Sequence, residues 1–217
     1  MNIFGFDVPS DIFWMLLSGL SYGLMTVIFL AGPYRKNKDE LMGAFLGFLA
    51  GMTLFHGVGG ISMLIGSPLL MNLAAFGAIT GSAFVLKFPL ASLFSRQKKQ
   101  ALFFSALIIG YLLVAWMFLG RLDPMQSMRL AAIYMIVFSG AISATYIIWR
   151  GFHLKDASLK VKCIGGGCSI LSCCFFAHVI VLAVGITTLV KFFIVLAPIT
   201  LILSLFFGNM LLKKSAV

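Results

Sequence analysis

The sequence predicts an all-α, polytopic integral membrane protein built as a bundle of seven transmembrane helices. The chain has 217 residues, of which 61% are hydrophobic and 10% are charged. Soluble domains carry about 25% charged residues, so this composition belongs in a lipid bilayer. The apolar residues gather into membrane-length stretches separated by short breaks. Together these observations predict a single transmembrane domain over residues 1–217.

A membrane-spanning helix needs about 20 mostly apolar residues. The stretches that satisfy this requirement cover residues 12–32, 41–65, 69–94, 101–120, 128–149, 163–184 and 189–212. The charged or Gly/Pro-containing breaks between them read AGPYRKNKDE, GSP, SRQKKQ, GRLDPMQS, RGFHLKDASLKVK and GIT. Such residues end helices and form turns, so each break is expected to reverse the chain.

Several details support individual stretches. Asp7 and Asp11 precede the first stretch, and no basic residue does, so it is not expected to be a cleavable signal peptide. The second stretch carries glycines four residues apart, at positions 43, 47 and 51, which would let helix backbones pack closely. Lys87 and Lys191 fall near the ends of the third and seventh stretches, where their side chains can extend to the membrane interface.

The distribution of Lys and Arg predicts the orientation. One set of loops and the tail carry Arg35, Lys36, Lys38, Arg96, Lys98, Lys99, Arg150, Lys155, Lys160, Lys162, Lys213 and Lys214. The opposite loops carry only Arg121 and Arg129. Because basic loops remain in the cytoplasm, we expect a multi-pass plasma (inner) membrane protein with its N-terminus outside and its C-terminus in the cytoplasm.

Missing groups exclude several functions. The acidic residues all lie outside the predicted membrane interior, at Asp7, Asp11, Asp39, Glu40, Asp123 and Asp156. Proton-coupled pumps usually need an intramembrane carboxylate, and Mg²⁺ or Ca²⁺ sites need oxygen ligands. No catalytic or nucleotide-binding motif is present, so nothing indicates an enzyme. The formal charge of +10 comes without a nucleic-acid-binding motif, so nucleic acid is not an expected partner.

The stretch 163–184 contains all four cysteines and one of the three histidines. Cys174 and His178 are four residues apart, so on a helix they lie on one face. Cys173 is adjacent to Cys174. Thiolate and imidazole bind soft or borderline metals such as Cu(I) or Zn(II), and an ionisable side chain inside a membrane is a candidate functional site.

A second histidine, His56, lies inside the stretch 41–65. On a regular helix it would share one face with Met52, Gly59, Gly60 and Met63. Thioether and imidazole again suit a copper-like ion. Each intramembrane histidine lies 15 residues after the cytoplasmic start of its stretch (41 to 56 and 163 to 178), so both are expected at one depth. The predicted metal ligands are therefore Cys173, Cys174, His178, His56, Met52 and Met63.

Three functions remain open. The first is binding or transport of a soft transition-metal ion. The second is a b-type haem electron-transfer subunit with His56 and His178 as axial ligands, where the glycines beside His56 would leave space for the cofactor. The third is a non-catalytic subunit or sensor that works through other membrane-protein subunits, in which each histidine simply bonds a backbone carbonyl. In all three the lipid bilayer is a partner.

The last two stretches, about residues 165–214, resemble a known hairpin. Ser172, Cys173 and Cys174, then Gly185, then Pro198 are similar to the vicinal-cysteine hairpin of mercuric-ion transport proteins and related uncharacterised membrane proteins. In that family the paired cysteines are taken to pass a thiophilic metal ion. The resemblance implies the same role for Cys173 and Cys174.

Overall fold

The computed structural model describes the N-terminal two thirds of the chain. The described residues are 2–3, 6–7, 9–36, 38, 40–87, 90, 95–120, 122–135, 137–138 and 180. The predicted stretches 163–184 and 189–212, apart from residue 180, and most of 128–149 lie outside them.

The described part is helical apart from a small antiparallel pair of strands, β1 (Asn2–Ile3) and β2 (Phe6–Asp7). Helix α1 (Ser10–Phe29) continues into a π-helical turn, η1 (Leu30–Tyr34). Helix α2 (Glu40–Thr53), the π-helical turn η2 (Leu54–Val58) and α3 (Gly59–Ile65) follow one another without a break. The remaining helices are α4 (Pro68–Val85), α6 (Arg96–Leu119) and α7 (Pro124–Met135).

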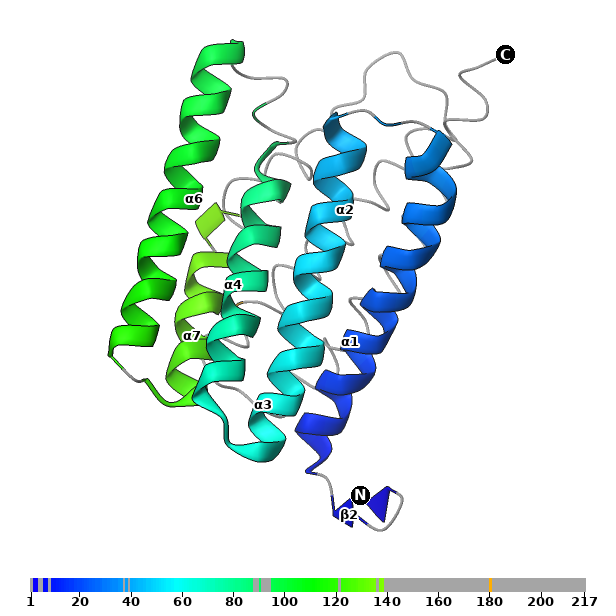
Figure 1. Ribbon diagram of the computed structural model, residues 1–217, viewed down its shortest axis with the longest axis vertical. Coiled ribbons are helices and arrows are strands. Elements are labelled where there is room, and N and C mark those ends of the chain that lie inside the picture. The colour runs from blue at the N-terminus through cyan, green and yellow to red at the C-terminus, as the bar shows by residue number, and fades with distance from the viewer. Residues whose placement is uncertain are drawn as a thin grey trace.

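The helices run side by side in alternating directions (Figure 1). Helix α4 contacts α2, α6 and α7, and α1 packs on the run from α2 to α3. Short connections produce this antiparallel order because neighbouring helices joined by tight turns must reverse direction. Helix α4 is therefore the centre of the described bundle.

Four of these helices are long and apolar enough to cross a membrane: Ile12–Gly32, Met42–Ile65, Pro68–Val85 and Arg96–Leu119. The first two agree with the predicted stretches 12–32 and 41–65. The fourth begins five residues before the predicted 101, because the residues RQKKQ favour helix and extend it beyond its apolar part. Helix α7 covers the beginning of the predicted stretch 128–149.

The break GSP forms a compact turn. Gly66 ends α3 in the left-handed conformation, with φ of 66°, which glycine adopts without steric cost. Pro68 begins α4, and Ser62 Oγ donates a hydrogen bond of 2.6 Å to the Ser67 carbonyl. At the start of α7, Asp123 Oδ1 accepts from the backbone N–H groups of Met125 and Gln126 at 2.9 and 3.0 Å. This is the side-chain cap that a helix N-terminus prefers.

Glycines bring two helix pairs into backbone contact. A Cβ added to Gly51 on α2 would lie 2.7 Å from the Cα of Gly81 on α4 and would also overlap the Gly77 carbonyl. A Cβ added to Gly19 on α1 would lie 2.6 Å from the Cα of Gly57 in η2. The close packing predicted from glycine spacing is thus confirmed at Gly51, while among the described residues a Cβ on Gly43 would meet only the Tyr34 side chain, at 3.7 Å.

Polar side chains add interhelical hydrogen bonds on the other side of α4. Ser127 Oγ on α7 donates to Asn72 Oδ1 on α4 at 2.8 Å. The Tyr134 hydroxyl on α7 donates to the Ala106 carbonyl of α6 at 2.7 Å. Both pairs are buried, so each polar group is satisfied within the bundle.

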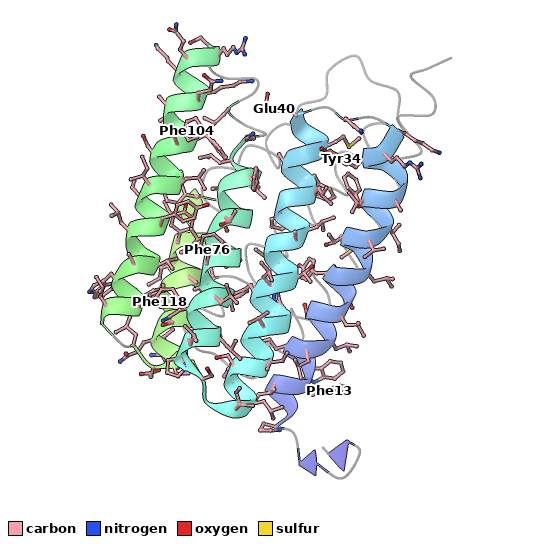
Figure 2. The ribbon with its side chains drawn as sticks, in the orientation of Figure 1. Phe13, Tyr34, Glu40, Phe76, Phe104 and Phe118 are labelled. Atoms are coloured by element: carbon pink, nitrogen blue, oxygen red, sulfur yellow. The ribbon has the colours of Figure 1, made fainter. Side chains whose placement is uncertain are left out.

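Basic residues gather at one end of the bundle. This end holds the C-termini of α1 and α4 and the N-termini of α2 and α6, with Glu40 among them (Figures 1 and 2). Lys87 Nζ lies 3.5 Å from Glu40 Oε1, and Lys99 Nζ lies 3.3 Å from Glu40 Oε2. Lys87 therefore reaches the end of the bundle, as the sequence predicts.

Candidate functional site

His56 lies within the π-helical turn η2, between α2 and α3. A π-helical turn has one more residue than an α-helical turn, and such single turns occur frequently at functional sites. The extra residue rotates the following helix about its axis. Met63 on α3 therefore does not follow Met52 and His56 with the regular spacing that the sequence interpretation assumed.

The imidazole of His56 is buried and firmly held. Its Nδ1 lies 3.0 Å from the carbonyl oxygen of Met52. Since a carbonyl oxygen only accepts, Nδ1 is the protonated nitrogen in this bond, and the lone pair of the neutral ring is on Nε2. The ring stacks on Tyr22 of α1, with centroids 5.2 Å apart and planes at 29°, and it meets the Phe55 ring edge-on.

The ring of His56 belongs to a row of polar side chains between α1 and the α2–η2 run, which we call the α1–α2 seam. Its members are Ser18, Tyr22 and Thr26 on α1, spaced four residues apart, and Thr53 and His56 opposite them. The hydroxyls of Thr26 and Thr53 lie 3.2 Å apart, and each also donates to the carbonyl one turn earlier in its own helix. The contact between Gly19 and Gly57 brings the two sides together.

The hydroxyls of Ser18 and Tyr22 differ from the others in the seam, because both are buried without a hydrogen-bond partner among the described residues. Tyr22 is completely buried and Ser18 is only 2% exposed. Within the described ranges, neither hydroxyl has a hydrogen-bond partner. A buried polar group that stays unsatisfied costs about 1–3 kcal/mol, so partners for these two hydroxyls would matter to stability. Buried polar groups of this kind in a membrane helix are candidates for a functional role.

Met52, Gly59 and Gly60 were predicted to share one face with His56, and their neighbours are on α1 and α4. Met52 is fully buried, and its methyl group lies 3.5 Å from the position of a Cβ on Gly81, so its side chain reaches toward α4. Gly59 and Gly60 were expected to leave space beside His56. Instead, a Cβ on Gly59 would be 2.8 Å from the Met15 methyl, and one on Gly60 would be 2.8 Å from Leu16. These two glycines let α1 approach rather than leaving room for a cofactor on that side.

The predicted ligands Cys173, Cys174 and His178 lie outside the described residues. In the part of the chain that the structure describes, no three His, Cys, Asp or Glu residues come together as a possible metal site. Sequence reasoning overlooked Ser18 and Tyr22. Their four-residue spacing within an apolar stretch was the available signal, since it places two hydroxyls on one helix face.

Comparison with protein-family models, with curated proteins and with solved structures finds no match to this chain. What the protein does is therefore inferred from its own residues.

The unpartnered hydroxyl of Tyr22 gives the first prediction. Replacing Tyr22 with Phe removes a buried hydroxyl that has no partner among the described residues, so thermal stability in detergent should stay equal or rise. Replacing Tyr134 with Phe is the matched control, because it removes a hydrogen bond of 2.7 Å to Ala106 and should cost about 1 kcal/mol. A larger loss for Tyr22→Phe than for Tyr134→Phe would mean that the Tyr22 hydroxyl has a partner in the working protein.

Proposed function

We propose that the protein is a multi-pass integral membrane protein that binds or transports a soft transition-metal ion, copper-like or thiophilic. The bilayer part of the proposal is supported by the four described helices of membrane length and composition. It extends them to seven spans in the plasma (inner) membrane, with the N-terminus outside and the C-terminus in the cytoplasm. The basic end of the described bundle would face the cytoplasm.

The observation that carries the metal proposal is which ring nitrogen of His56 is protonated and hydrogen-bonded. Its Nδ1–H donates to the Met52 carbonyl, so the lone pair of the neutral ring is on Nε2. Metal-binding histidines almost always donate their other N–H to a carboxylate, a carbonyl or water, which fixes the ring and its tautomer. Burial against Tyr22 and Phe55 fixes it further.

The remaining ligands would come from the stretch 163–184. Cys173 and Cys174 supply the sulfur that Cu(I) and other thiophilic ions prefer, and His178 supplies a second imidazole. The expected equal depth of His56 and His178 would let one ion contact both. The resemblance of Cys173 and Cys174 to the hairpin of mercuric-ion transport proteins supports passage of the ion as well as binding.

The orientation has its own test. Reporter fusions placed after residue 94 and at the C-terminus should give cytoplasmic signals, such as fluorescence of a green fluorescent protein. Alkaline phosphatase fused after residue 122, in the opposite loop, should be active because it would be outside. Phosphatase activity at both residue 94 and residue 122 would contradict the alternating arrangement.

The metal proposal is tested by metal analysis and a visible spectrum of purified protein. Wild type should contain a copper-like or thiophilic ion that is lost in Cys173→Ser/Cys174→Ser. The matched control, Cys163→Ser/Cys168→Ser, should retain it. His56→Ala should weaken binding by at least about tenfold, whereas His153→Ala should not, because only a ligand or its support has effects of that size.

Other outcomes of the same experiment point to other functions. A Soret band that disappears in His178→Ala would establish haem in place of a soft metal. Equal, near-zero metal in wild type and in the cysteine variant, with no Soret band, would reject both the soft-metal and the haem function. Co-purification of another membrane protein in stoichiometric amount would then favour a non-catalytic subunit.

A further inference from the structure

A small pocket lies at the basic end of the bundle, where α2 begins, α4 ends and α6 begins. Its volume is about 110 Å³, and its walls include Glu40, Lys87, Leu90, Lys99, Phe103 and Phe104. Neither the ion of the proposed metal site nor the α1–α2 seam uses any of these residues. The pocket is therefore a separate feature of the fold.

The pocket has an excess of positive charge. Two ammonium groups, of Lys87 and Lys99, share the single carboxylate of Glu40 at 3.5 and 3.3 Å. The hydrogen bond from Lys99, together with the nearby charge of Lys87, lowers the pKa of Glu40, so the carboxylate is ionised at neutral pH. One positive charge remains within the cluster. The N-terminus of α6 contributes further positive potential.

Aromatic rings hold one of the ammonium groups in place. Lys87 Nζ lies 4.7 Å from the centroid of the Phe103 ring and 5.6 Å from that of Phe84. Such cation–π contacts restrict the side chain without neutralising its charge. Lys87 is therefore positioned to bind an anion that can compete with Glu40.

Below the pocket, an apolar stripe runs along the outer face of α6 toward the membrane interior. Phe104, Ile108 and Leu112 follow one another at four-residue spacing, and they are 58%, 58% and 66% exposed. Residues at this spacing form a continuous ridge on one side of a helix. The pocket thus combines a cationic opening at the membrane interface with a hydrocarbon surface beneath it.

We propose that this pocket binds the phosphate group of an anionic phospholipid. The phosphate would pair with the ammonium groups of Lys87 and Lys99, and an acyl chain would lie along Phe104, Ile108 and Leu112. Basic pockets between helices on the cytoplasmic side of a membrane suit anionic lipid headgroups. Glu40 makes the pocket selective for lipid over free anions. Its carboxylate repels every anion, and only a lipid offsets that repulsion through contact of its acyl chain with α6.

The test uses the full-length protein in detergent, with native mass spectrometry to measure binding of phosphatidylglycerol and phosphatidylcholine that have the same acyl chains. Wild type should bind phosphatidylglycerol more tightly. Lys87→Gln and Lys99→Gln should each weaken that binding by about fivefold. Glu40→Gln should strengthen it, because the competing carboxylate is gone.

The matched control is Lys98→Gln. Lys98 lies on the first turn of α6 beside Lys99 but does not line the pocket. Its replacement should change phosphatidylglycerol binding by less than about twofold, because only general surface charge is lost. If the lysine variants fold poorly, Lys87→Arg and Lys99→Arg keep the charge and should retain binding, and Glu40→Gln remains decisive.

Equal affinity for the two lipids, or equal losses in Lys98→Gln and Lys99→Gln, would overturn the proposal. Displacement of phosphatidylglycerol by excess inorganic phosphate would also overturn it, and would assign the pocket to a soluble phosphate compound. These outcomes are independent of metal content, so they leave the proposed metal function untouched.

Discussion

Backbone contact at glycines is the constraint on which the rest of the described bundle depends. Lipid offers no hydrophobic drive for helices to associate, so they must pack by close van der Waals contact and hydrogen bonds. Gly51 meets Gly81 at the α2–α4 crossing, and Gly19 meets Gly57 at the α1–η2 crossing. The second contact brings Tyr22 onto the His56 ring and encloses the α1–α2 seam. His56 lies beside this crossing and is only 1% exposed.

Much of the fold could be predicted from the sequence because membrane helices leave strong signals. Apolar length located the helices Ile12–Gly32 and Met42–Ile65, and the Gly66-Ser67-Pro68 break became a turn with a left-handed glycine. The π-helical turn at His56 could not be predicted. Face assignments from sequence assume 3.6 residues per turn, and an extra residue rotates everything after it. For that reason the glycines after His56 were assigned to the wrong neighbours, and the face predicted for Met63 assumed a regular helix that this turn interrupts.

Contacts between residues that are far apart in the sequence could not be predicted either. The sequence predicts that Lys87 reaches the membrane interface, and it does, but the partner is Glu40, 47 positions earlier. The same carboxylate holds Lys99, from a third helix. Likewise, nothing local joins Tyr22 to His56, although each could be identified as polar within an apolar stretch. Residue type and depth can be inferred along one helix, whereas contacts between helices require the packed bundle.

The most direct measurement of the central claim compares the thermal midpoints of Gly51→Ala and Gly57→Ala in detergent. Both glycines are on the α2–η2 run, but a Cβ on Gly51 would overlap α4, whereas a Cβ on Gly57 would meet no described residue within 4 Å. Overpacking a close contact costs about 1–3 kcal/mol, and alanine at an open helical site is neutral or stabilising by about 0.5–1 kcal/mol. Gly51→Ala should therefore lower the midpoint while Gly57→Ala keeps or raises it. Equal midpoints would show that the glycine crossing does not hold the bundle together.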